Sequence, residues 1–284
     1  MSSENKVKPV PANPQWNTRF KSYAFADGIE KTLCEEFRNA EALLMQSKIA
    51  KNSRSTSAGI FHLHGTDYFI KRSNANGLFR QLRRIGSISR AKRNALMAAE
   101  LEKIGVLTPK VYMVLDTRPY GLPGSSYLIT GCFPAPIAVG GNMQDLRNFF
   151  GSNENFISAL AQLAARLHGS GIEHGDFKIN NILVVRDENG NFKLGVFDLD
   201  GARKHSGCCP DNVRARELAR VASSYFIRSY NLRFYNAGDE AENCKLFLQS
   251  YAQHSGVDLT ENREFYKLLE KFLAADTKHR IRND

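Results

Sequence analysis

Apolar residues recur every three or four positions in several parts of the chain, which is the pattern of an amphipathic helix. The first stripe consists of Ile29, Leu33, Phe37, Ala40 and Leu44. Because Asp27 and Glu30 precede it at the spacing of a capping box, we expect one helix over residues 27–45. Two further helices are predicted, over residues 89–103 before Gly105 and around the apolar stripe at 156–167.

Alternating apolar and polar positions predict antiparallel strands between these helices. The pattern gives strands over residues 60–72 (a hairpin around the turn HGTD), 111–115, 126–130, 182–185 and 193–197. The last two flank the turn DENG and form a second hairpin. Residues 49–59 are rich in Ser, Lys and Arg and are predicted to be a loop. From residue 213 onward the chain is predicted to be mainly helical.

The strand-rich segments come first along the chain and the helical segments follow. This order predicts an α+β fold with a small antiparallel-sheet N-lobe and a mainly helical C-lobe. We expect a flexible N-terminal arm over residues 1–17, the N-lobe with its preceding helix over 18–131, and the C-lobe over 132–284. A chain of 284 residues is long enough for two such parts, each with its own core.

The composition is that of a globular protein, with 42% hydrophobic and 24% charged residues. No stretch approaches the roughly 20 apolar residues of a spanning helix. The start, MSSENKVKPVPANP, lacks the apolar core of a secretory signal, so we expect a cytoplasmic protein. The five cysteines form no CxxC pair and are expected to be reduced thiols.

Positive charge is concentrated in one segment. The chain has 39 Lys and Arg against 29 Asp and Glu, a formal net charge of +10, and no acidic residue between Tyr68 and Ala99. Such a segment attracts nucleic acid, an anionic membrane or a phosphorylated substrate, although a solvated basic face is an equal explanation. Charge alone names no partner.

The residues that indicate a chemistry are HGDFKINN at 174–181 and FDLDG at 197–201. Phosphoryl transfer depends on positioning and on neutralising charge on the transferred group. In that reaction Asp176 would accept the proton of the attacking hydroxyl, and Lys178 would lie where charge develops on the phosphate. Asn181 and Asp198 would supply oxygen ligands to Mg²⁺.

HGDFKINN resembles the protein-kinase catalytic loop H-R-D-L-x-x-x-N, and Asp198 matches the DFG aspartate. YFIK at 68–71 resembles the strand that carries the ATP-binding lysine, here Lys71. The chain more closely resembles the bacterial lipopolysaccharide core kinases, the Kdo and heptose kinase family, over roughly residues 46–252. The resembling stretches are YFIKRSNANGLFRQLRRIGSISRAKRNA, GVLTPKVY, ARLHGSGIEHGDFKINNILV, FDLDGAR and FLQSYAQ.

This resemblance implies a two-lobed protein-kinase-like fold, and an enzyme that uses ATP and Mg²⁺. Three features of the sequence depart from the kinase pattern. Gly175 replaces the arginine that reads a phosphorylated activation loop, which implies activity without such phosphorylation. SRSTSAG at 53–59 replaces the glycine-rich loop, with Ser55 and Ser57 as candidates to cover the phosphates. The glutamate that pairs with the lysine in kinases has either Asn94 or Glu100 as its counterpart here.

The expected activity is phosphorylation of a Kdo or heptose hydroxyl of the lipopolysaccharide inner core, in the cytoplasm or at the inner face of the inner membrane. Two alternatives stay open: a kinase of another small molecule or of protein, and a degenerate kinase fold that only binds. Nucleic-acid binding rests on charge alone and is not expected. The oligomeric state has no signature in the sequence.

Overall fold

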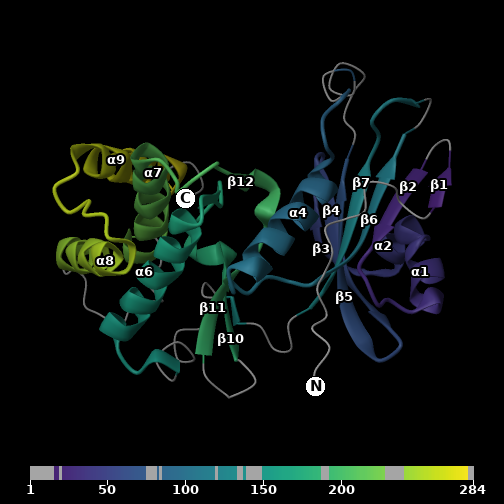
Figure 1. The fold of residues 1–284 in the computed structure, drawn as a ribbon, viewed down its shortest axis with the longest axis horizontal. Helices are drawn as coiled ribbons and strands as arrows, with labels where there is room; N and C mark the ends of the chain where they lie inside the picture. The colour runs from purple at the N-terminus through teal and green to yellow at the C-terminus, as the bar shows by residue number, and fades with distance from the viewer. Residues whose placement is uncertain are drawn as a thin grey trace. The chain divides into compact units, whose positions relative to one another are not determined.

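The structure, a computed structural model, describes residues 16–18, 21–74, 82, 85–118, 121–132, 137–138, 149–186, 192–227 and 240–280. The chain divides into two compact units. Unit 1 comprises residues 1–100 and 109–134, and unit 2 comprises residues 101–108 and 135–284. Figure 1 shows the strand-rich part mainly in purple, blue and teal and the helical part in teal (α6), green and yellow.

Unit 1 is built on an antiparallel sheet that has seven strands within the described residues, in the order β1-β2-β6-β7-β5-β4-β3. The strands are β1 (Trp16–Thr18), β2 (Lys21–Phe25), β3 (Lys48–Asn52), β4 (Thr56–Leu63), β5 (Thr66–Ser73), β6 (Val111–Thr117) and β7 (Ser126–Gly131). Its helices are α1 (Lys31–Phe37), α2 (Ala40–Gln46) and α4 (Arg90–Lys103), of which the last three residues belong to unit 2.

Helices cover both faces of this sheet, because side chains on successive strand residues point to opposite sides. On one face Phe37 and Leu44, from α1 and α2, pack with Ile70, Met113 and Ile129. On the other face the small residues Ala91 and Ala95 of α4 pack against Val114 and Leu128. Lys71 pairs with Leu128 across β5 and β7, so its side chain lies on the face that α4 covers.

Two predictions for this unit are wrong. The single helix over residues 27–45 is two helices, because Asn39 has a non-helical backbone (φ −87°, ψ 36°) between α1 and α2. The capping box is also absent, since Glu30 is the N-cap of α1 and its side chain makes no cap hydrogen bond. The loop over residues 49–59 is instead a β-hairpin, β3 and β4, whose turn at 53–55 carries Ser55.

The other predicted elements of unit 1 are confirmed. β4 and β5 form the hairpin around HGTD, and α4, β6 and β7 lie where the patterns place them. Trp16–Thr18, at the end of the expected N-terminal arm, forms β1, and residues 1–15 of that arm lie outside the described residues.

Unit 2 is mainly helical. Its helices are α6 (Asn153–Gly169), α7 (Asp211–Ala222), the π-helix η4 (Ser223–Ile227), α8 (Glu240–Ser255) and α9 (Arg263–Arg280), with the short 3-10 turns η2 (Ile179–Asn181) and η3 (Leu199–Gly201). Within the described residues α6 packs on α8, and α7 packs on α9. The strands are β8 (Ile137–Ala138), β9 (Ile172–Glu173), β10 (Ile182–Arg186), β11 (Phe192–Val196) and β12 (Arg203–Lys204).

The strands of unit 2 position the predicted catalytic loop. β10 pairs with β11 as predicted, while the turn DENG lies outside the described residues. β9 and β12 form a separate two-stranded pair. The loop 174–178 follows β9, which pairs with β12, and leads into η2, which is followed directly by β10. In the described part of the chain, no helix is long and apolar enough to cross a membrane.

Candidate active site

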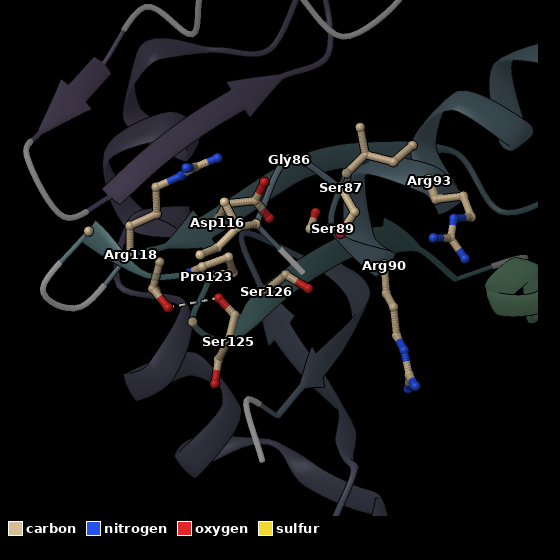
Figure 2. A pocket seen from close by; sticks show the side chains of 15 residues that line it. Gly86, Ser87, Ser89, Arg90, Arg93, Asp116, Arg118, Pro123, Ser125 and Ser126 are labelled. Carbon is tan, nitrogen blue, oxygen red and sulfur yellow. Dashed lines mark hydrogen bonds between the residues drawn. The ribbon is translucent and has the colours of Figure 1, made fainter. Parts of the chain in front are cut away.

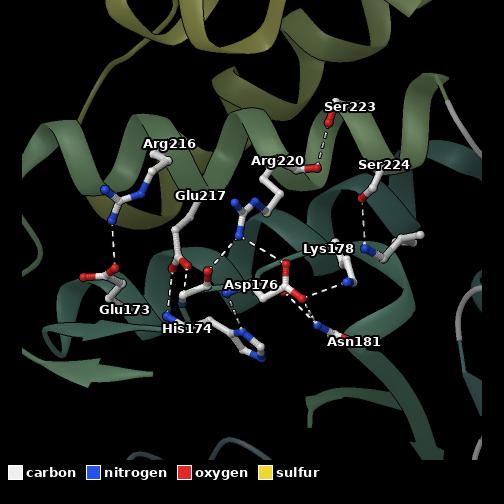
Figure 3. Close-up of polar contacts among 12 residues, drawn as sticks. Glu173, His174, Asp176, Lys178, Asn181, Arg216, Glu217, Arg220, Ser223 and Ser224 are labelled. Atoms are coloured by element: carbon white, nitrogen blue, oxygen red, sulfur yellow. Dashed lines mark hydrogen bonds and ion pairs between the residues drawn. The ribbon is translucent and has the colours of Figure 1, made fainter. Parts of the chain in front are cut away.

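Asp176 lies at the centre of the polar contacts of this loop, and both of its carboxylate oxygens are engaged (Figure 3). Oδ2 forms an ion pair with Nζ of Lys178 at 2.7 Å and accepts a hydrogen bond from Nδ2 of Asn181 at 3.1 Å. Oδ1 forms an ion pair with Nη1 of Arg220 at 3.1 Å. The side chain is still 37% exposed, so it is fixed in orientation while a substrate can reach it.

Asn181 joins the loop to the strand hairpin that follows it. Its Nδ2 also donates to the main-chain oxygen of Asp176, at 2.9 Å, and its own main-chain oxygen accepts from the N–H of Phe197, at 3.1 Å. This second bond fixes the end of β11 next to Asn181, directly before Asp198. The structure therefore brings three of the predicted residues, Asp176, Lys178 and Asn181, into mutual contact, with Asp198 following the strand end bonded to Asn181.

Asp198 has a left-handed backbone, with φ 60° and ψ 62°, and is the N-cap of η3. This region is sparsely populated by residues other than glycine, and such conformations cluster at functional sites. It ends β11 abruptly and turns the chain into η3, whose Gly201 lies against Gly175. The aspartate is thus set at a sharp strand end, as the sequence motif predicted.

Gly175 explains the departure from the protein-kinase motif. Its φ is +82°, and an added Cβ would lie 2.3 Å from the main-chain oxygen of Gly201, so neither the backbone nor the space admits a side chain. An arginine at this position is excluded. Arg220 of α7 instead supplies a guanidinium beside Gly175, because its Nη1 also donates to the main-chain oxygen of Gly175 at 2.7 Å.

Glu217, one turn before Arg220 on α7, holds the loop backbone. Its Oε2 accepts from the N–H of His174 at 2.9 Å and its Oε1 from the N–H of Gly175 at 2.6 Å. The side chain is buried, and burial alone would raise the pKa of this carboxyl. The hydrogen bonds that this carboxylate accepts from the ring of His168 and from the N–H of His174 hold the pKa below its ordinary value. The buried carboxylate of Glu217 therefore has hydrogen-bond donors at both of its oxygens.

His174 braces the loop from inside. Its Nε2 donates to the main-chain oxygen of Phe197 at 3.0 Å, and its Nδ1 accepts from the N–H of Asp176 at 3.3 Å. These partners assign the neutral tautomer with the proton on Nε2. Burial of the ring lowers the pKa of His174, which keeps the imidazole neutral. His168 is likewise a buried hydrogen-bonded histidine, between Tyr251 and Glu217.

The candidate residues of unit 1 lie on different faces of its sheet. Ser57 pairs with Arg72, and Ala58 pairs with Lys71, so the side chains of Ser57 and Lys71 point to opposite sides. The hydroxyl of Ser57 donates to Oδ1 of Asn52 at 3.0 Å, on the face of α2. Ser55 is exposed in the β3–β4 turn. This turn shares one feature with the loop expected to cover the phosphates, which is its position in the chain before the strand that carries Lys71.

The two candidate partners of Lys71 both lie on α4. Asn94 is buried, and its Nδ2 donates to the main-chain oxygen of Arg90 at 3.3 Å. Glu100 lies two turns later on the same helix. The choice between them stays a prediction.

Sequence reasoning missed Glu217 and Arg220, which form most of the loop's support. The signal was present in α7, where Arg214 and Glu217 occur at positions three apart within the apolar stripe of the helix. A charged residue in a stripe that faces a core must find a partner there, because burying it unpaired is costly. The partners of Glu217, the N–H groups of His174 and Gly175, lie 40 or more residues earlier in the chain. The sequence of the helix alone cannot identify them.

The model of the lipopolysaccharide kinase (Kdo/WaaP) family matches residues 36–251 of this chain. Among solved structures, WaaP in complex with acyl carrier protein is similar with a TM-score of 0.60 and 19% identity, over 83% of this chain and 90% of that chain. The Rio2 kinase from Chaetomium thermophilum, in a complex with ADP, Mg²⁺ and phosphoaspartate, has a TM-score of 0.45 and 13% identity, over 87% of this chain and 75% of that chain. The search of curated proteins found no significant match.

The likeness to WaaP confirms the expected α+β kinase-like fold. The family match covers well over half of the chain and includes both the catalytic loop and the segment around Asp198, so the resemblance drawn from the sequence is confirmed as well. The chain is a kinase, and it belongs to the lipopolysaccharide kinase (Kdo/WaaP) family.

Proposed function

We propose that this kinase transfers the γ-phosphoryl group of ATP to a hydroxyl of Kdo or heptose in the inner core of lipopolysaccharide. The observation that supports this most is the geometry of Asp176, a half-exposed carboxylate whose two oxygens are held by three side chains. Family membership supplies the class of acceptor, a lipopolysaccharide sugar.

Asp176 is the proposed base. It accepts the proton of the sugar hydroxyl as the new oxygen–phosphorus bond forms and the bond between the γ-phosphorus and the ADP oxygen breaks. A base in this role must present one oxygen in a fixed direction. Arg220 on one carboxylate oxygen and Asn181 on the other supply that orientation, since the carboxylate cannot rotate without breaking one of these contacts.

Lys178 is the proposed electrostatic group. Its ammonium contacts Asp176 at 2.7 Å and is about one third exposed, so it can reach both the base and an incoming phosphoryl group. A cation preplaced where negative charge develops lowers the barrier, because it does not have to reorganise during the reaction.

The oxygen donors of the site fit a hard divalent cation. The amide nitrogen of Asn181 faces Asp176, which directs its carbonyl oxygen elsewhere, and carbonyl and carboxylate oxygens are the ligands that Mg²⁺ prefers. Asn181 and Asp198 would hold Mg²⁺ together with the phosphate oxygens of ATP. Within the described ranges, no three His, Cys, Asp or Glu side chains form a metal-binding group of their own.

In unit 1, Lys71 is the proposed phosphate-binding lysine and Ser55 the proposed residue of the covering turn. Ser57 is less suited to that role than the sequence indicated, because its hydroxyl is already hydrogen-bonded to Asn52 on the other face of the sheet.

The proposed location is the cytoplasm, with peripheral contact at the inner membrane. There an anionic core acceptor would be presented to a chain of net charge +10.

The test compares the unaltered protein with Asp176→Asn and with Asp27→Asn, a matched change of an exposed carboxylate in the other unit. Each is incubated with ATP, Mg²⁺ and dephosphorylated core lipopolysaccharide, and the acceptor mass is measured. We expect a gain of one phosphate with the unaltered protein and with Asp27→Asn, and none with Asp176→Asn. Turnover by folded Asp176→Asn would refute the role of that residue.

The alternatives give different results in the same assay. No mass gain, with ATP bound and transferred to another sugar or to protein, would replace the acceptor and keep the kinase chemistry. No transfer to any acceptor and no ATP binding would favour a degenerate kinase fold that only binds.

A further inference from the structure

Three exposed apolar side chains lie close together in the sequence just before α4. Leu82 is 47% exposed, Ile85 61% and Ile88 46%, and the N–H of Ile85 donates to the main-chain oxygen of Leu82 at 3.1 Å. Exposed aliphatic side chains are normal when they are scattered singly, whereas a group of them beside polar residues is typical of an interaction site. These three are nearly half of the large exposed apolar residues of the described chain.

Basic residues follow immediately, at the start of α4. Arg90 and Arg93 extend from the first turn of the helix, as Figure 2 shows. The first turn of α4 contains no acidic residue. The amino end of a helix carries partial positive charge, so arginine there is unfavourable for the helix unless an anion is nearby. Positions that break such a local rule are candidates for function.

All of these residues except Leu82 line one hollow of about 360 Å³ within unit 1. Ile85, Ile88, Arg90 and Arg93 are among its lining residues, and Figure 2 shows Arg118, which follows β6, across from Arg90 and Arg93. The one acidic residue among the lining residues is Asp116, which is largely buried, hydrogen-bonded by Ser89 and offset by the charges of Lys92 and Arg118. The surface therefore presents positive charge beside apolar groups.

We propose that Leu82, Ile85, Ile88, Arg90 and Arg93, hereafter the apolar–basic patch, bind the surface of an anionic membrane. The isoleucines enter the boundary between headgroups and acyl chains, and the arginines bind lipid phosphate groups at the rim of the hollow. Charge complementarity selects this occupant, because no acidic residue lies between Tyr68 and Ala99 to repel an anionic surface. This combination of aliphatic and basic side chains is the one that peripheral membrane segments use.

The expected size of the effect follows from known contributions. An arginine near an anionic surface strengthens binding about fivefold, so two arginines strengthen it by up to about 30-fold. Burial of one aliphatic side chain contributes about tenfold or more. Neither the arginines alone nor the aliphatic side chains alone give firm binding to a membrane. Removing either group should therefore weaken membrane binding by a measurable factor.

The experiment is co-sedimentation of the full-length protein with large vesicles, without ATP, so that it does not depend on the proposed kinase reaction. Vesicles of phosphatidylcholine alone are compared with vesicles that contain about 30% phosphatidylglycerol, which supplies the anionic surface. We expect at least about tenfold stronger binding to the anionic vesicles, and weaker binding as NaCl concentration rises.

Two double variants test the two parts of the patch, with circular dichroism to verify folding. Ile85→Ser with Ile88→Ser and Arg90→Gln with Arg93→Gln should each weaken binding to anionic vesicles by about tenfold or more. The matched control, Ile49→Ser with Ile60→Ser, removes exposed aliphatic side chains from β3 and β4 and should bind as the unaltered protein does. Equal binding to neutral vesicles, no binding to either vesicle, or loss in the control pair alone would overturn the proposal.

Discussion

Arg220 of α7 and Asp176 of the loop after β9 form an ion pair, with Nη1 3.1 Å from Oδ1. The same nitrogen donates to the main-chain oxygen of Gly175 at 2.7 Å. The guanidinium also lies over the ring of Phe272 of α9, 5.2 Å from its centroid, so α7 and α9 together hold it in place. One side chain therefore fixes both the backbone before the proposed base and the base itself.

Replacing Arg220 should lower kcat more than it changes the KM for ATP. Arg220→Gln keeps a polar side chain but removes the ion pair and shortens the reach, which leaves the carboxylate of Asp176 held at Oδ2 only, by Lys178 and Asn181. A misplacement of this kind costs about 10- to 100-fold in rate. Steady-state kinetics with the lipopolysaccharide acceptor measure it.

Arg216→Gln is the matched control for this prediction. Arg216 lies one turn earlier on α7 and contacts Oε1 of Glu173 at 2.7 Å, not Asp176. It should keep most of its kcat. An equal loss in both variants would show that α7 has been disturbed as a whole, and full activity in folded Arg220→Gln would contradict the positioning role.

The sequence predicted best those elements whose pattern is local. The hairpin around HGTD and the helix of residues 90–103 have clear periodicity and clear stop signals, and the structure contains both. β3 was missed because it is the edge strand of the sheet and all five of its residues are exposed, so no alternation of apolar and polar positions marks it. The break at Asn39 was missed because Phe37, Ala40 and Leu44 keep helical spacing across it.

The residues of the candidate site also fall into two groups, those that a local sequence motif predicts and those that it does not. Asp176, Lys178 and Asn181 lie within six residues of one another, so one loop motif predicts their contact. Glu217 and Arg220 are more than 40 residues further along, and only the packing of α7 brings them to the loop. Residues that position a site from another element need tertiary structure to be found, even where the reacting groups are visible in the sequence.

Gly175→Ala should destabilise the protein and abolish activity. The left-handed backbone and the 2.3 Å approach of a Cβ to the main-chain oxygen of Gly201 both oppose a side chain. We expect a loss of about 2 kcal/mol or more in the free energy of unfolding, and a fall of several degrees in Tm. Gly207→Ala is the control, because its backbone is not left-handed and a Cβ added there would meet no atom of the described residues within 4 Å. Equal Tm values for the two variants would contradict the prediction.

Glu217→Gln should destabilise unit 2 by about 3 kcal/mol, because a neutral amide replaces a buried carboxylate oxygen that accepts a main-chain N–H. The pKa of Glu217 is lowered in the folded protein, so this carboxylate contributes stability above its ordinary value of 4.5 and loses it as pH falls through the folded pKa. Urea unfolding at pH 7 and below pH 4.5 measures both effects.

The control for that variant is Glu242→Gln, an exposed change on α8. It should leave the unfolding free energy within about 0.5 kcal/mol of the unaltered protein. Glu217→Gln unfolding at the same urea concentration as Glu242→Gln would show that the carboxylate does not hold the loop.

Asn181→Ala should raise the Mg²⁺ concentration needed for half-maximal activity by about tenfold, since one oxygen ligand is lost. It should also lower kcat at saturating Mg²⁺, because Asp176 loses the hydrogen bond at 3.1 Å. Asn180→Ala, the adjacent exposed asparagine, should change neither quantity. A lowered kcat with an unchanged Mg²⁺ requirement would restrict Asn181 to holding Asp176 and remove it from the metal site.

His174 gives the protein a second sensitivity to acid, in a higher pH range than Glu217. Burial lowers its pKa below 6.5 in the folded protein, whereas the unfolded chain binds a proton near 6.5. The unfolded state therefore takes up more protons as pH falls below about 6.5, and the free energy of unfolding should fall in that range. Urea unfolding at pH 7.5, 6.5 and 5.5 measures the slope of the unfolding free energy against pH.

Two histidine variants test whether His174 causes this slope. His174→Asn should be less stable at pH 7.5 but should lose most of the slope, whereas His254→Asn, an exposed change on α8, should keep it. An unaltered slope in His174→Asn would assign the acid sensitivity to other groups.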